Sequence, residues 1–70
     1  MIKTTETIAL GTALRRCREA AGLSVMDAAV KVGTIATSVY KWEQGKHVPT
    51  EENKAKLAAA YRCSVADFYR

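Results

Sequence analysis

The sequence predicts an all-α fold, a compact bundle of five short helices. The chain has 70 residues, which suffices for one domain with a small core. Nearly half of the residues are apolar and many of these are alanine, so the core is expected to consist of closely approaching helices with few large side chains. Three of the glycines follow helical segments, where glycine commonly ends a helix.

The N-terminal third predicts a flexible arm followed by the first helix. Residues 1–7 are polar and threonine-rich without helical periodicity, and we expect them to precede a single domain of residues 8–70. A helix is predicted from Ile8 to Ala21, because apolar side chains recur along one stripe of it. Gly22 then stands where a helix C-terminus is expected.

The second helix is expected from about Val25 to Val32. Ser24 precedes it as an N-cap residue, and the carboxylate of Asp27 stands where it can face the unpaired amides of the first turn. Gly33 follows, and glycine readily adopts the positive φ that a tight turn requires.

The third helix is expected from about Ala36 to Gln44 and completes a helix-turn-helix layout. Val39 and Trp42 are spaced to pack inward, and the opposite side carries the polar residues Thr37, Tyr40, Lys41 and Gln44. In this motif the second helix enters the DNA major groove and the first crosses the backbone. Double-stranded DNA is therefore the predicted partner.

Two further helices complete the predicted bundle. Thr50 is expected to cap a fourth helix of about Glu51 to Tyr61, and Ser64 a short fifth helix of Val65 to Tyr69. The chain carries a net charge of +4, and residues 1–49 hold seven Lys and Arg against four Asp and Glu. The basic excess thus lies in the half that contains the helix-turn-helix, which favours an acidic polymer as partner.

The cysteines and the apolar pattern indicate neither a metal site nor a membrane segment. Cys17 and Cys63 are far apart in sequence, no CxxC or HxxxH spacing accompanies them, and each occupies an apolar position, so both are interpreted as buried small hydrophobic residues. No segment approaches the ~20 apolar residues of a membrane span. We expect a cytoplasmic protein with no cofactor, metal or small-molecule ligand, and no disulfide.

Four stretches carry a family resemblance: LGTALRRCREAAGLS, DAAVKVG, SVYKWEQGKHVPT and KLAAAYRCSVADF, which span Leu10 to Phe68. In order and spacing the chain resembles the helix-turn-helix domain of the phage repressor and Cro family and of the related xenobiotic-response-element-like bacterial regulators. The resemblance implies a lambda-repressor-like bundle in which the second and third helices form the motif.

The resemblance also implies roles for individual residues. By position, Ala36, Thr37 and Lys41 are expected to contact base edges. Residues expected to contact the DNA backbone, or to flank the base-contacting residues, are Ser24, Ser38, Tyr40, Gln44, Lys46 and His47. Arg18 and Glu43 match an ion pair that holds the first helix against the end of the third.

Three positions depart from the family pattern. Val25 replaces a frequent glutamine, Ala28 a usual leucine and Ile35 the usual Ser or Thr cap of the third helix. Ala28 thins the core unless Met26, Ile35 or Tyr40 fills the space, and Thr34 is an alternative cap. The residues expected to contact base edges, here called the reading set, are also sparse in Asn, Gln and Arg, the side chains that discriminate bases best.

The pattern favours a sequence-specific transcriptional regulator, a repressor of phage or mobile-element type that binds DNA as a homodimer. Tyr69 is the favoured interface residue, whereas Phe68 is expected to close the core. The alternative is a protein-binding module of the same fold, such as an antirepressor, an antitoxin-like partner or an adaptor, which the apolar departures favour. An enzyme is disfavoured, because the sequence holds no catalytic triad pattern, phosphate-binding glycine loop or metal spacing.

Overall fold

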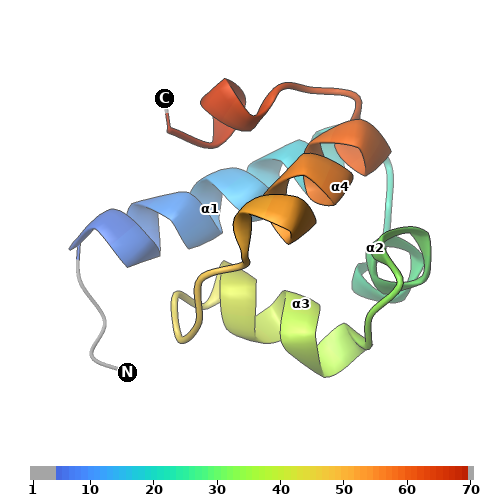
Figure 1. The fold of residues 1–70 in the computed structure, drawn as a ribbon, viewed down its shortest axis with the longest axis horizontal. Helices are drawn as coiled ribbons and strands as arrows, with labels where there is room; N and C mark the ends of the chain where they lie inside the picture. Colours follow the sequence, from blue (N-terminus) through green and yellow to red (C-terminus); the bar gives the residue numbers. More distant parts are fainter. Residues whose placement is uncertain (1–4, 70) are drawn as a thin grey trace.

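The computed structural model describes residues 5–69, which form four α-helices and one 3-10 helix (Figure 1). No strand occurs in this range, so the all-α class is confirmed. None of its helices is long and apolar enough to cross a membrane. The elements are α1 (Thr5–Ala20), α2 (Val25–Val32), α3 (Ala36–Glu43), α4 (Glu51–Tyr61) and the 3-10 helix η1 (Val65–Tyr69).

The fifth predicted helix is wrong in type, because η1 is a 3-10 helix. The Asp67 amide donates to the Ser64 carbonyl oxygen at 3.0 Å, an i to i+3 bond that tightens the first turn. The Asp67 carboxylate in turn accepts from the Ser64 amide at 2.9 Å. Five residues are typical of the short pieces in which 3-10 geometry occurs. The bundle therefore contains four α-helices, not five.

The first helix begins at Thr5, three residues earlier than predicted. Glu6 lies in its first turn, where a carboxylate interacts favourably with the positive end of the helix dipole. The backbone of Gly45 approaches Thr7 and Ile8, so the loop after α3 packs against this turn. The predicted arm thus does not extend to residue 7, and residues 1–4 lie outside the described range.

One apolar core holds the elements together. Val39 and Trp42 point into it from α3, as their spacing predicts. Phe68 anchors η1 in it, with its ring edge-to-face against Tyr61 at a centroid distance of 6.5 Å. The largest side chains with almost no exposed surface are Phe68, Leu14, Leu57 and Val39.

Helices α1 and α3 are in close contact at Gly11. A Cβ atom at Gly11 would lie 2.8 Å from the carbonyl oxygen of Trp42 and closer still to that of Glu43. Only a residue without a side chain fits here, which explains a glycine inside a helix, where it is intrinsically unfavourable. The sequence does contain this signal, a glycine within the apolar stripe of the first helix, although a single sequence does not reveal what packs there.

Element η1 lies on the far side of α1 and α4 from α3 (Figure 1). It also covers Lys54, a residue that the helical pattern did not single out. The Lys54 ammonium lies 5.3 Å from the centre of the Tyr69 ring and 3.0 Å from a carboxylate oxygen of Glu51. A buried ammonium needs such partners, so Tyr69 contributes to the monomer as well as presenting exposed aromatic surface.

Candidate nucleic-acid interface

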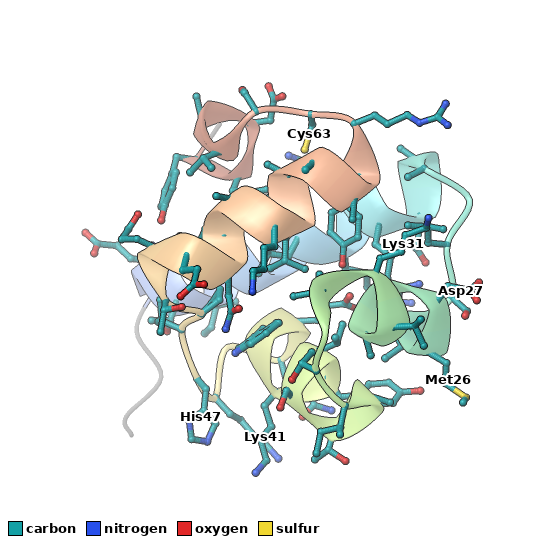
Figure 2. All side chains as sticks on the ribbon, turned by 45° about the vertical axis from the view of Figure 1, so that its right-hand side comes forward. Met26, Asp27, Lys31, Lys41, His47 and Cys63 are labelled. Carbon is teal, nitrogen blue, oxygen red and sulfur yellow. The ribbon has the colours of Figure 1, made fainter. Side chains whose placement is uncertain are left out.

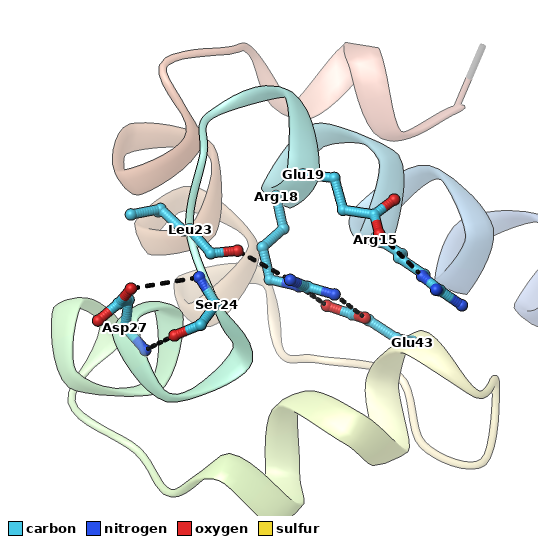
Figure 3. A network of polar contacts seen from close by, with 7 residues as sticks. All are labelled: Arg15, Arg18, Glu19, Leu23, Ser24, Asp27 and Glu43. Carbon is cyan, nitrogen blue, oxygen red and sulfur yellow. Dashed lines mark hydrogen bonds and ion pairs between the residues drawn. The ribbon is translucent and has the colours of Figure 1, made fainter.

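The start of α2 and its turn to α3 follow directly from local sequence rules. The Ser24 hydroxyl accepts from the Asp27 amide at 3.0 Å, and the Asp27 carboxylate accepts from the Ser24 amide at 3.2 Å (Figure 3). These reciprocal bonds form a capping box. Gly33 ends the helix with a φ of 82°, and its amide donates to the Ala29 carbonyl oxygen at 2.9 Å. The predicted helix–turn–helix geometry is present.

Helix α3 has an inner face built for packing and an outer face exposed to solvent. Val39 and Trp42 are buried, whereas Thr37, Tyr40 and Lys41 are exposed. The helix begins after Ile35, whose side chain makes no capping hydrogen bond. The alternative of a cap at Thr34 is therefore wrong. At the other end the last helical residue of α3 is Glu43, and Gln44 is its C-cap.

Arg18 and Glu43 join α1 to the end of α3 (Figure 3). Two guanidinium nitrogens of Arg18 donate to the two carboxylate oxygens of Glu43 at 2.7 and 3.1 Å, and a third donates to the Leu23 carbonyl oxygen at 2.8 Å. The two side chains are only 11% and 7% exposed. The hydrogen bond with Glu43 is the main cause that raises the pKa of Arg18. This junction sets the angle at which α3 is presented.

A first hollow lies between the start of α2 and the second half of α3. It brings together three of the predicted flanking residues, Ser24, Tyr40 and Gln44, with Met26 and Arg15. Arg15 reaches it from α1 and forms only a long, exposed ion pair with Glu19, at 3.4 Å. The hollow therefore combines a cation, hydroxyl groups and an amide, which are donors suited to a phosphate.

A second hollow lies beside α3 and the loop that follows it. Ser38, Lys41 and His47 line it, together with Trp42 and Val48. Figure 2 shows Lys41 and His47 projecting from the same edge of the molecule. The two hollows account for six of the nine residues that the sequence assigned to DNA, so α3 divides the candidate surface into two sides.

The other three assigned residues line neither hollow. Thr37 and Lys46 are exposed, and Ala36 at the start of α3 is partly exposed. They are available to a ligand that approaches the outer face of α3. The Lys46 amide donates to the Lys41 carbonyl oxygen at 2.9 Å, which folds the loop back against the end of the helix.

The residues that depart from the family pattern, and those expected to compensate for them, differ in burial. Val25 packs partly against the core and Ala28 is completely buried, so both serve the contact between α2 and its neighbours. Met26, Ile35 and Tyr40 are all more than half exposed. The prediction that one of them fills the space left by Ala28 is therefore wrong. Small buried residues bring the helices together instead.

The cysteines line neither of these two hollows and are only partly buried, whereas buried small hydrophobic residues were predicted. They come from α1 and from the turn after α4, yet both line one hollow, together with Ala20 and Tyr61. Desolvation by burial, with a smaller contribution from Cys17, raises the pKa of the Cys63 thiol to about 11. The thiol of Cys63 is therefore protonated near neutral pH.

Known proteins resemble this chain in sequence and in fold. A family model described as a helix-turn-helix domain matches residues 9–68. A comparison with curated proteins finds no match. Among solved structures, the restriction-modification controller protein C.AhdI from Aeromonas hydrophila is 28% identical with a TM-score of 0.88, over 93% of this chain and 98% of its own.

The clp gene regulator ClgR from Corynebacterium glutamicum is also similar. One of its structures is 27% identical with a TM-score of 0.85, over 96% of this chain and 87% of its own. A second is 26% identical with a TM-score of 0.88, over 97% and 72%. Both ClgR structures are titled as a gene regulator, and the fold is shared over nearly all of the present chain.

Proposed function

Because the chain belongs to the helix-turn-helix domain family, we propose that it is a transcriptional regulator that binds double-stranded DNA with α3 in the major groove. The observation that carries the proposal is the outer face of α3, where Thr37 and Lys41 are exposed on a helix whose other side is fixed by the core. A controller protein and a gene regulator with the same fold support it.

The chemistry of α3 suits base reading at a few positions. Lys41 can donate to the O6 and N7 atoms of guanine, and Thr37 can donate, accept or contact a thymine methyl group. Ala36 presents a methyl group beside them. The set is small, so we propose that one copy reads a short half-site and that selectivity comes from two copies bound together.

The two hollows beside α3 supply phosphate contacts in this proposal. Arg15, Ser24 and Gln44 act in the first hollow and His47 in the second, and the exposed Lys46 of the same loop adds a cation outside the hollows. Such contacts fix the register of the helix on the duplex. The backbone amide of Ser24 already donates to the Asp27 carboxylate. The phosphate is therefore expected to meet side chains: the Ser24 hydroxyl, the Gln44 amide and the Arg15 guanidinium.

The regulator acts as a homodimer in this proposal, and repression is its simplest mode, by occupying a promoter. Tyr69 is the candidate interface residue because η1 lies away from α3 and leaves this ring 60% exposed. Helix-turn-helix dimers contact half-sites about one helical turn apart, and the same spacing is expected of this dimer.

The experiment that tests the function is selection of binding sites from randomised duplex DNA, followed by affinity measurements at several salt concentrations. The proposal expects an inverted-repeat motif and a log affinity that falls with log salt by ~0.9 for each neutralised phosphate. Recovery of no motif, with weak binding that vanishes at moderate salt, would refute it.

One observation favours a second candidate, a protein-binding module. Met26, Val30 and Ile35 are large apolar side chains exposed on the helix-turn-helix itself, and exposed apolar surface commonly marks a protein interface. The absence of a selected DNA motif, with a protein partner whose binding is lost in Met26→Ser and Ile35→Ser variants, would support this candidate instead.

A further inference from the structure

The first residue ahead of α3 is exposed in a way that folding does not explain. Ile35 is the N-cap of the helix, it makes no side-chain capping bond, and 66% of it is exposed. Ser, Thr, Asn or Asp at this position would satisfy an amide of the first turn. The free protein gains no cap and little burial from this isoleucine. Positions that break local rules without a folding benefit are candidates for function.

The location of Ile35 decides which ligand its side chain meets. In a helix-turn-helix the N-terminal residues of the second helix contact base edges. Ile35 directly precedes Ala36 and Thr37, and the following turn carries Lys41. Ile35 is therefore continuous with the proposed reading set, and its side chain is the largest apolar group at the tip that enters the groove.

The major groove offers one apolar group, the C5 methyl of thymine, and apolar side chains contact it. A partner must also suit two exposed cations, Lys41 on α3 and Lys46 in the loop that follows it. A duplex with thymine methyl groups fits both features at once. A purely apolar protein surface would fit Ile35 but would leave these lysines desolvated.

We infer that Ile35, with the Ala36 methyl group beside it, reads thymine by its C5 methyl group at one or two positions of each half-site. This inference rests on the proposed function and specifies its ligand as a site rich in thymine methyl groups. Because the reading set holds few bidentate donors, apolar contact supplies discrimination that hydrogen bonds do not.

The test replaces thymine by deoxyuridine, one position at a time, in the duplex recovered by selection. Deoxyuridine keeps every hydrogen-bonding group of thymine and lacks only the methyl group. We expect the wild-type protein to lose affinity about fourfold at one or two positions, which corresponds to one buried methyl group. The Ile35→Ser variant, which introduces a capping residue and so keeps the fold, should lose this penalty at the position that Ile35 contacts.

Val30→Ser is the matched control. It removes a β-branched apolar side chain that is 79% exposed, but from α2, the helix that crosses the backbone. This variant should keep the full penalty for deoxyuridine.

Each outcome separates the inference from the proposed function. A selected motif bound with no deoxyuridine penalty overturns the inference and leaves DNA binding intact. A penalty that persists in Ile35→Ser overturns the role of Ile35. Failure to recover any bound DNA overturns the proposed function and the inference with it.

Discussion

The inner and outer faces of α3 differ in what determines their residues. On the inner face Val39 and Trp42 are buried, Glu43 is ion-paired, and the backbone touches Gly11. On the outer face Thr37 and Lys41 are exposed to solvent. The comparison teaches that packing accounts for one side of this helix, so the side chains on its other side are the ones that carry information about function.

The largest expected effect comes from breaking the inner face at its ion pair. Glu43→Ala leaves a buried guanidinium without its carboxylate, which should cost ~3–5 kcal/mol. A 70-residue chain is expected to have a total stability of only about 4–10 kcal/mol. The variant should therefore lose a large part of its stability, seen as a much lower midpoint of urea denaturation followed by the fluorescence of Trp42.

Glu19→Ala is the matched control, since the Arg15–Glu19 pair is exposed and should contribute less than ~0.5 kcal/mol. If Glu43→Ala melts like the parent while its DNA binding is weakened, the residue belongs to the reading surface and the division of α3 proposed above is wrong.

A somewhat smaller effect is expected at the crossing of α1 and α3. Gly11→Ala improves helix propensity by ~1 kcal/mol, yet its methyl group collides with two backbone carbonyls that cannot move independently. Net destabilisation of about 1–3 kcal/mol should follow. Thr12→Ala, an exposed neighbour, controls for propensity. Equal or greater stability of the Gly11→Ala variant would show that the helices separate at no cost.

On the outer side, Lys46→Ala should weaken DNA binding without changing the melting temperature. If Lys46 contacts one phosphate, the affinity should fall evenly across all sequences and the salt slope should decrease by about 0.9. Salt titrations of fluorescence anisotropy on two unrelated duplexes measure both quantities. Loss confined to the selected duplex would assign Lys46 to base reading.

The smallest effect concerns the far side of the molecule, away from α3. Because the pKa of Cys63 is raised to about 11, its thiol is almost wholly protonated at pH 8, and alkylation by iodoacetamide should be slow in the native protein. The rate should increase about tenfold per pH unit up to about pH 11. Peptide mapping by mass spectrometry assigns the label to Cys63 with Cys17 left in place, because Cys17 contributes to the raised pKa, and the chain unfolded in urea gives the reference. Equal rates in the native and unfolded protein would contradict the raised pKa.

Local rules in the sequence predicted much of the fold. The capping box of Ser24 and Asp27, the turn at Gly33 and the inward spacing of Val39 and Trp42 depend on residues close in the chain. The start of α1 and the type of η1 were missed. The first depends on a contact with the loop at Gly45, and the second on how five residues close over the core.

The candidate site was less accessible to sequence reasoning. Ser24, Tyr40 and Gln44 were named separately, but their convergence with Arg15 on one hollow depends on how α1 crosses the motif. The burial of Lys54 beneath Tyr69, and the shared hollow of Cys17 and Cys63, likewise arise from distant segments. Periodicity identifies a face of a helix; it does not identify what lies opposite that face.

The most direct test of the division between the two faces of α3 is a parallel selection of DNA sites by the wild-type protein and a Lys41→Gln variant. We expect equal melting temperatures and two motifs that differ at one position of each half-site, because glutamine pairs with adenine where lysine contacts guanine. Recovery of the same motif by both proteins, with a uniform loss of affinity, would contradict base reading by the outer face of α3.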